Sequence, residues 1–249
     1  MLFKVLKGLF GKKSEVQATA SERNADDKNI AYAIPHVNGD NYVGDIDNDT
    51  LKPEGRGKLT SSNGDVYEGE FKVDKPHGYG KMIYANGDIY EGDYFEGYPH
   101  GMGRESLMDG RTYVGSFANG QYSGIGKLSD FTGQIYEGEF KEGLSHGKGI
   151  STHVNGDVFD GEWKKGVPDG YLKATYSDGR IYEGEWKAGM ACGFGKEIYK
   201  DGSRYEGEFC LDKKSGHGKM YYSDGSVYNG LWGSDVPNGE GTYTFQDGR

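Results

Sequence analysis

The sequence predicts an all-β fold, an elongated single-layer ribbon of about nine consecutive antiparallel β-hairpins. Three observations predict it: an aromatic residue recurs every 23 residues, glycines keep the same spacing, and each period contains an alternating strand pattern that ends at a polar-glycine turn. Of 249 residues, 44 are glycine and 20 are tyrosine, while only 34% are hydrophobic. Too few branched aliphatic residues are present for a two-layer core, so we expect stacked aromatic rings to supply the apolar contacts.

Eight aromatic residues define the repeat frame, each 23 residues from the next. They are Tyr67, Tyr90, Tyr113, Tyr136, Phe159, Tyr182, Tyr205 and Tyr228. Glycine follows each of them two residues later, and a second aromatic residue follows two positions further on. A degenerate unit begins earlier, at Tyr42. We therefore expect a repeat array of about nine units over residues 39–249.

A Gly-x-Gly pair and a polar-glycine turn complete each unit. The sixth unit departs from this pattern, because Leu172 stands where the second glycine is expected. The run Tyr-Glu-Gly-Glu-Trp alternates between two faces, as a strand does. Turns such as Asn86-Gly87 supply the positive φ angles of a tight type I′ hairpin turn. Each unit is thus predicted to be one hairpin, with a slightly longer loop at its other edge.

The succession of Tyr-Glu-Gly-Glu-Phe/Trp, a loop, Gly-x-Gly and a polar-glycine turn resembles the MORN (membrane occupation and recognition nexus) repeat family. The resemblance is specific because many framed positions recur in register. It implies an elongated, gently twisted ribbon of hairpins used for membrane association or for holding another protein. Family members with enzymatic activity carry a fused methyltransferase or lipid-kinase domain. Because the repeats run to Arg249, we expect no such domain and no catalysis.

Charged residues follow the same frame. Acids such as Glu68 and Glu70 alternate with the aromatics of the first strand. A basic row runs along the second strands at Lys81, Arg104, Lys127, Lys173, Lys196 and Lys219. If the turn register places both rows on one face, they form a cross-strand charge ladder, and the sequence leaves that register open. The net charge of −10 opposes nucleic-acid binding.

Two compatible interpretations apply to the aromatic residues. The rings form the core of a thin sheet, or the aromatic face forms a shallow, glycine-floored groove for a helical or extended segment of a partner protein. A single-layer sheet has no second layer to cover that face. The predicted partner-binding residues are Tyr90, Tyr94, Tyr113, Phe117, Tyr136, Phe140, Phe159, Trp163, Tyr182, Trp186, Tyr205 and Phe209.

The first 13 residues differ from the repeats. Apolar residues cluster on one side of a helical wheel and lysines lie roughly opposite, which predicts a basic amphipathic helix over residues 1–13 and a flexible linker over residues 14–38. Three roles stay open for the helix: a cap on the first hairpin, an anchor on an acidic phospholipid membrane, or a partner-binding segment. The predicted membrane residues are Leu2, Phe3, Lys4, Leu6, Lys7, Leu9, Phe10, Lys12 and Lys13.

No catalytic or metal-binding motif is found in the sequence, and no cofactor is expected. His77, His100 and His146 share one loop position, but rows two strands apart are separated by roughly 10 Å, too far for a shared metal ion. Two cysteines without a partner framework favour a reducing compartment, so we expect a cytoplasmic protein, with attachment to the inner face of a membrane as an alternative. An unpaired terminal strand predicts homodimerisation through the C-terminal repeat.

Overall fold

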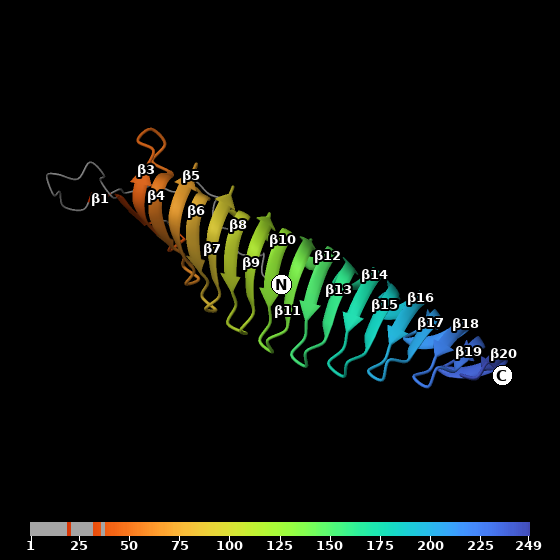
Figure 1. Cartoon of the computed structure of the whole chain (residues 1–249). Helices are drawn as coiled ribbons and strands as arrows, with labels where there is room; N and C mark the ends of the chain where they lie inside the picture. The colour runs from red at the N-terminus through yellow and green to blue at the C-terminus, as the bar shows by residue number, and fades with distance from the viewer. Residues whose placement is uncertain (1–18, 21–31, 36–37) are drawn as a thin grey trace. The chain divides into compact units, whose positions relative to one another are not determined.

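A computed structural model describes residues 19–20, 32–35 and 38–249 of the chain, and every described element is a β-strand (Figure 1). The chain divides into two compact units, Met1–Leu128 and Ser129–Arg249. Within each unit, strands that are consecutive in the sequence pair with one another. The predicted all-β arrangement of successive antiparallel hairpins is therefore confirmed for each unit.

The first unit contains ten strands. They are β1 (Thr19–Ala20), β2 (Tyr32–Pro35), β3 (Asn41–Ile46), β4 (Pro53–Thr60), β5 (Val66–Lys72), β6 (Lys75–Ile83), β7 (Ile89–Phe95), β8 (Tyr98–Ser106), β9 (Thr112–Ala118) and β10 (Gln121–Ser129), whose last residue crosses the unit boundary. The second unit contains ten more. They are β11 (Ile135–Lys141), β12 (Leu144–Thr152), β13 (Val158–Lys164), β14 (Val167–Thr175), β15 (Ile181–Lys187), β16 (Met190–Ile198), β17 (Arg204–Cys210), β18 (Lys213–Tyr221), β19 (Val227–Gly233) and β20 (Val236–Thr244).

The predicted linker contains strand structure where it is described. Residues 32–35 form β2, which pairs antiparallel with β3, so that Tyr32 lies opposite Gly44. The main chain of residues 32–35 thus pairs along one edge of β3. The predicted helix at residues 1–13 lies outside the described residues.

The tight turns lie at the opposite end of each hairpin from the prediction. Strands β7 and β8 join through Glu96 (φ 49°) and Gly97 (φ 89°), and two consecutive positive φ angles are the mark of a type I′ turn. The polar-glycine segments are the longer loops: the Gly87 N–H donates to the Tyr84 carbonyl at 2.8 Å, and only Gly87 has a positive φ there. The sequence did not distinguish the two ends of a hairpin, because Asn119-Gly120, which forms a tight turn, is also a polar residue followed by glycine.

The framed aromatic side chains form the core. Tyr67 is 1% exposed and its ring meets Phe71 and Tyr94 edge to face, with both centroid distances at 5.0 Å. The contact with Tyr94 reaches the next hairpin, and the ladder continues through Tyr90 to Phe117. Edge-to-face pairs add about 0.5–1.5 kcal/mol each beyond the area they bury, so the ladder ties neighbouring hairpins together.

Each framed tyrosine also lies over a pair of glycines. The Tyr67 hydroxyl donates to the Glu70 carbonyl at 2.8 Å, and a Cβ atom at Gly80 would stand 2.2 Å from that hydroxyl oxygen. Gly69 pairs directly with Gly80, and the register shifts immediately afterwards, between Gly69 and Phe71. The space left by the glycines on the aromatic face is thus filled by the tyrosine ring.

Candidate functional site

The predicted partner-binding residues lie inside the sheet rather than on an open strip. All twelve except Phe159 are buried, with exposed fractions no higher than the 8% of Trp163. The aromatic face is not partly exposed, because rings of adjacent hairpins meet edge to face. Pro76 and Met82, the second-strand partners of Phe71 and Tyr67, are buried beside them. A partner could reach such rings only where the lattice is interrupted.

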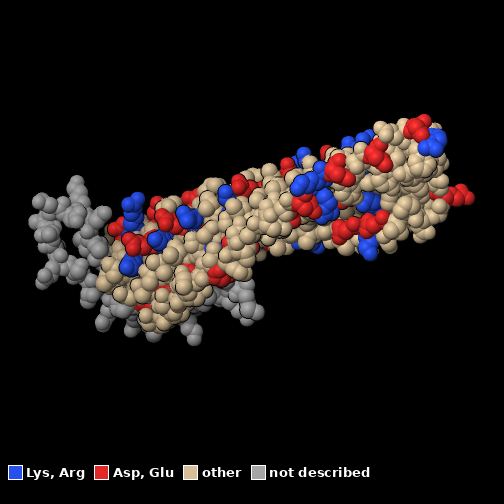
Figure 2. Space-filling model, turned by 60° about the horizontal axis from the view of Figure 1, so that its bottom comes forward, with Lys and Arg blue, Asp and Glu red and all other residues tan. Residues whose placement is uncertain are grey.

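The opposite face of the sheet carries the charges. Glu68 lies between Lys58 and Lys81 in the strand register, and Glu183 lies in the same way between Lys173 and Lys196. Acidic and basic rows therefore share one face, which settles the register that the sequence left open. Figure 2 shows acidic and basic side chains interspersed on the surface. The pairs are exposed, so each contributes little stability, on the order of 0–1 kcal/mol.

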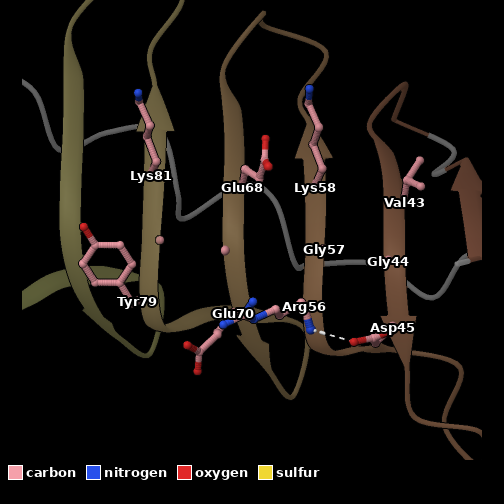
Figure 3. Close-up of a pocket in the computed structure, with 12 residues that line it drawn as sticks. Val43, Gly44, Asp45, Arg56, Gly57, Lys58, Glu68, Glu70, Tyr79 and Lys81 are labelled. Carbon is pink, nitrogen blue, oxygen red and sulfur yellow. Dashed lines mark hydrogen bonds between the residues drawn. The ribbon is translucent and has the colours of Figure 1, made fainter. Parts of the chain in front are cut away.

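Shallow grooves run across this charged face. In the first unit, a groove of about 550 Å³ has backbone glycines as its floor and charged side chains as its walls (Figure 3). Asp45 accepts a hydrogen bond from the Arg56 N–H at 3.0 Å on one side of the floor. A groove of about 560 Å³ recurs in the second unit beside Tyr171 and Phe194. Because these grooves follow from the repeat itself, they do not single out one site.

The aromatic lattice is interrupted at the sixth repeat. Leu172 lies between Gly161 and Gly184 and is fully buried, at a place where other repeats have glycine beneath a tyrosine ring. The framed aromatic here is Phe159, which has no hydroxyl and cannot make the hydrogen bond that Tyr67 makes. The residues paired with Phe159 across the strands, Ser151 and Ala174, are both small. The sixth repeat therefore departs from the others at both framed positions.

A cavity of about 440 Å³, open to solvent, lies beside Phe159. Its lining consists of Gln134, His153, Phe159, Trp163, Gly166, Pro168, Tyr176, Trp186, Gly189 and Asp212. The Phe159 ring lies 5.8 Å from Trp186, 5.9 Å from Tyr176 and 5.0 Å from His153, measured between ring centroids. The walls are therefore mostly aromatic. Three of the predicted partner-binding residues, Phe159, Trp163 and Trp186, meet here.

One wall residue has an unsatisfied donor. Trp163 Nε1 donates to the Gly149 carbonyl at 2.9 Å, and Trp232 Nε1 donates to the Gly218 carbonyl at 3.1 Å. For Trp186, the position equivalent to these glycines is occupied by Leu172. The buried Nε1 of Trp186 has no hydrogen-bond partner in the described part of the chain. An unsatisfied buried N–H costs about 1–3 kcal/mol.

The cavity is suited to binding rather than to chemistry. Burial raises the pKa of Tyr176 to about 12, with Asp212 and Glu197 adding to the effect against the nearby Arg180, so the hydroxyl stays protonated at neutral pH. Asp212 lies at the rim and accepts a hydrogen bond from the Ala191 N–H at 2.7 Å. No nucleophile and base are paired among the lining residues.

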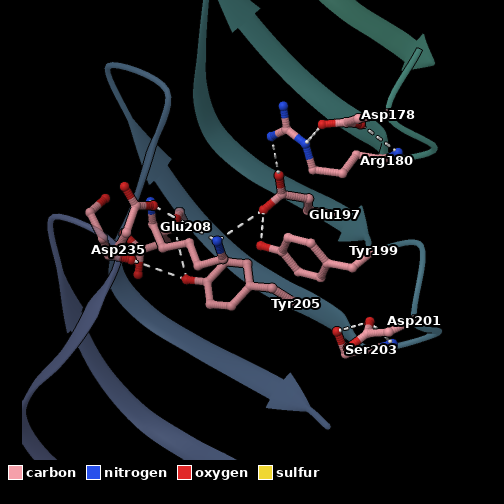
Figure 4. A network of polar contacts seen from close by, with 11 residues as sticks. Asp178, Arg180, Glu197, Tyr199, Asp201, Ser203, Tyr205, Glu208 and Asp235 are labelled. Atoms are coloured by element: carbon pink, nitrogen blue, oxygen red, sulfur yellow. Dashed lines mark hydrogen bonds and ion pairs between the residues drawn. The ribbon is translucent and has the colours of Figure 1, made fainter. Parts of the chain in front are cut away.

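A polar network lies near the cavity, and its groups satisfy one another (Figure 4). Glu197, 7% exposed, accepts hydrogen bonds from Arg180 at 3.3 Å and from the Tyr199 hydroxyl, and forms an ion pair with Lys214 at 2.9 Å. Arg180 also pairs with Asp178 at 2.8 Å. Glu197 and Lys214 are thus paired inside the network, while Arg180 and Asp178 form its exposed side.

Other sequence candidates are not assembled into sites. Among the residues that the structure describes, no group of three or more His, Cys, Asp or Glu side chains could hold a metal ion. His77 and His100 instead lie on either side of Phe95, at 5.4 and 5.6 Å between ring centroids. No helix in the described ranges is long and apolar enough to cross a membrane. The predicted membrane residues fall in residues 1–13, outside those ranges.

Comparison with known proteins identifies the repeat. The family model described as MORN repeat matches nine segments, residues 52–66, 67–89, 90–110, 113–135, 136–158, 159–179, 182–204, 205–227 and 228–248. A mutant TCP10 domain of CPAP from Danio rerio is similar in structure, with a TM-score of 0.44 and 15% identity over 87% of this chain and 95% of that chain. The TCP domain of SAS-4 from Drosophila melanogaster, solved with a proline-rich motif of Ana2, has a TM-score of 0.30 and 12% identity over 85% of this chain and 95% of that chain. No curated protein matches the sequence.

Proposed function

Since the chain belongs to the MORN repeat family, we propose that it is a non-catalytic scaffold that holds a segment of a partner protein in the cavity of its sixth repeat. One observation carries this proposal: an aromatic cavity of about 440 Å³, open to solvent, lies beside Phe159, in the repeat where tyrosine and glycine are replaced together by Phe159 and Leu172.

The cavity has the composition of a recognition site. Concave sites are lined mainly by apolar and aromatic side chains, with a few polar groups that fix orientation. Phe159, Trp163, Tyr176 and Trp186 supply the apolar walls. Tryptophan and tyrosine are also the residues that contribute most binding energy at protein interfaces. Phe159 is the one predicted partner-binding residue that is not buried, which places the proposed contact at this repeat.

Restoring the repeat consensus tests the proposal. In a Phe159→Tyr/Leu172→Gly variant the tyrosine ring can settle over the glycine pair, as Tyr67 does, and close the cavity. We expect wild-type protein to enrich a common motif from a displayed random-peptide library, and the variant to lose that enrichment. Because the variant follows the pattern of the other repeats, its melting temperature should equal or exceed that of the wild type. Loss of binding would then not reflect unfolding.

A Phe194→Tyr variant provides the matched control, because Phe194 is 65% exposed on the charged face and does not line the cavity. It should enrich the same peptides as the wild type. If no motif is enriched, or if the consensus variant enriches the same motif, the proposed function is wrong.

The second candidate function is attachment to an acidic phospholipid membrane through residues 1–13. Its support is the sequence pattern of lysines opposite an apolar side. Co-sedimentation with vesicles of phosphatidylserine and phosphatidylcholine tests it: full-length protein should pellet, added salt should weaken pelleting, and deletion of residues 2–13 should abolish it. Equal pelleting with and without these residues would contradict it.

A further inference from the structure

We infer that Cys192 and Cys210 form a redox-sensitive pair, which a peroxide oxidises to a disulfide between two neighbouring repeats. They are the two cysteines of the chain, and both are free thiols in the structure. Three features support the inference: the pairing of β16 with β17, a side-chain contact at the same two positions of an earlier repeat, and the exposure of the thiols. The pair would act whether or not the cavity binds a partner, so it is independent of the proposed function.

The strand pairing places the two cysteines side by side. Gly193 in β16 lies opposite Phe209 in β17, and the next residues on the two strands are Cys192 and Cys210. Opposed residues of antiparallel strands have Cα atoms about 4.5–5.5 Å apart. A disulfide joins residues whose Cα atoms are about 4.4–6.8 Å apart. The backbone therefore needs little movement to accommodate the bond.

A second main-chain contact holds the two strands together beyond the cysteines. The Asp212 N–H donates to the Ala191 carbonyl at 3.1 Å, and the Asp212 carboxylate accepts from the Ala191 N–H at 2.7 Å. The paired strands lie on one side of the two cysteines and these hydrogen bonds lie on the other. The thiols are therefore held near one another from both sides.

An earlier repeat shows that side chains at these two positions meet. His77 and Phe95 precede Cys192 and Cys210 by five 23-residue periods, and their ring centroids lie 5.4 Å apart. Phe95 is 50% exposed, so this contact lies on the surface of the sheet and not in the aromatic core. The thiols occupy the same surface, where Cys210 is exposed and Cys192 is half-buried. Solvent and small oxidants can therefore reach the pair.

Peroxide chemistry closes the pair in two steps. The exposed Cys210 thiol attacks a peroxide oxygen, the O–O bond breaks, and the sulfur becomes a sulfenic acid while the peroxide leaves as water or an alcohol. The Cys192 thiol then attacks that sulfur, the S–O bond breaks, and water leaves as the disulfide forms. The two thiols together lose two electrons and two protons, which the peroxide takes up. A dithiol reductant reverses the oxidation.

The disulfide would hold closed a turn at the rim of the cavity. Asp212, which lines the cavity, follows Cys210 by two residues, and its N–H hydrogen bond to Ala191 lies directly beyond the cysteines. Separation of β16 from β17 at this edge breaks that hydrogen bond. A covalent link between the same strands suppresses such local opening, because the cross-linked chain has fewer open conformations.

Peroxide treatment of the folded, full-length protein tests the inference. The two free thiols should disappear together, with no disulfide-linked dimer on a non-reducing gel. After the remaining thiols are blocked with iodoacetamide, trypsin should release residues 188–196 linked to residues 205–213. If both thiols survive, or if the link forms only in urea, the inference is wrong.

A Cys210→Ser/Ser215→Cys variant is the matched control. Ser215 is the equivalent of Cys192 in the next repeat, so the variant keeps two thiols but places them two strands apart, at roughly 10 Å. That separation exceeds the reach of a disulfide. Peroxide should leave sulfenic acids that dimedone traps, with no link within the chain. An equally rapid link in this variant would show that the strand pairing does not select the two cysteines, and would overturn the inference.

Hydrogen exchange followed by NMR tests the effect on the turn. The Asp212 N–H should exchange about tenfold more slowly in the oxidised protein than in the reduced protein. The Asp235 N–H donates to the Lys214 carbonyl at 3.2 Å, at the equivalent place in the next repeat, and should exchange at the same rate in both states. An Asp212 rate that does not change, or that changes equally with that of Asp235, would contradict the proposed closure of the turn.

Discussion

The hydroxyl oxygen of Tyr67 stands 2.2 Å from the point where a Cβ atom at residue 80 would lie, and two ring carbons of Tyr67 lie 2.5 Å from it. The ring is buried and cannot move away without disturbing Phe71 and Tyr94. We therefore expect Gly80→Ala to lower the free energy of unfolding by about 1–3 kcal/mol. Chemical denaturation measures this. The leucine side chain of a Tyr67→Leu variant ends short of the ring atoms, so in that variant Gly80→Ala should lower the free energy of unfolding by less. An equal loss would show that the glycine serves another purpose.

How far the sequence could predict this arrangement differs from feature to feature. The framed spacing of Tyr67 and its counterparts predicted the hairpins and the family. It could not tell that the tyrosine ring fills the glycine space, because this depends on the register shift between Gly69 and Phe71 and on the side-chain rotamer. Leu172 was visible as a departure from the repeat, but the cavity was not. Its lining comes from several repeats, from Gln134 to Asp212, and only the strand register brings these residues together.

Asp88 connects two repeats through their loops. It is 5% exposed, and one carboxylate oxygen accepts from the Met108 N–H at 2.8 Å while the other accepts from the Asn86 side chain at 2.7 Å. Asp88→Ala should lower the free energy of unfolding by about 1.5–3 kcal/mol, because it removes the charged acceptor of a partly buried main-chain N–H.

Asp109→Ala is the control for Asp88→Ala. Asp109 is exposed and its carboxylate accepts only from Arg111 in its own loop, at 3.0 Å from the N–H. Its removal should cost about 0–1 kcal/mol. Equal losses from the two variants in urea denaturation would contradict the proposed link between repeats.

The tight turns hold L-residues at positive φ. Ala188 has φ 50° and precedes Gly189 at φ 86°. Asparagine tolerates this region better than alanine, so Ala188→Asn should raise the free energy of unfolding by about 0.5 kcal/mol. Thermal denaturation checks the direction. Ala85→Asn, in an exposed loop position where φ is negative, should bring no such gain; a similar gain there would point to an effect unrelated to the turn.

Replacing Glu197 alone should lower the free energy of unfolding more than replacing Glu197 and Lys214 together. The equivalent position in other repeats holds Met82 and Met220. Glu197→Met leaves the half-buried Lys214 without its 2.9 Å partner and should cost about 3 kcal/mol in the free energy of unfolding. A Glu197→Met/Lys214→Met variant should recover most of that loss, because Arg180 keeps Asp178. A double-mutant cycle in guanidinium chloride measures the coupling, and additive losses would refute it.

Glu105 should make the first unit less stable as pH rises. Burial raises the pKa of this carboxyl above its ordinary value, and Asp88 adds to the effect, while the hydrogen bond from Tyr122 and the charge of Arg111 oppose it. A carboxyl with a raised pKa favours the protonated form in the folded state. The contribution of Glu105 to the free energy of unfolding is therefore fully present below the ordinary carboxyl pKa and is lost as pH rises through the raised pKa.

Glu105→Gln keeps an acceptor for the Tyr122 hydroxyl and removes the titration. We expect the melting temperature of the wild type, relative to the variant, to fall as pH rises above the ordinary carboxyl pKa and through the raised pKa of Glu105. Subtracting the two melting curves cancels the pH-dependent contribution of exposed carboxylates that titrate in both proteins. Asp109 is one of them, and the hydrogen bonds it accepts from Arg111 lower its pKa. A difference that is flat with pH, or that grows in favour of the wild type, would mean that Glu105 is solvated or paired well enough in solution to ionise without cost.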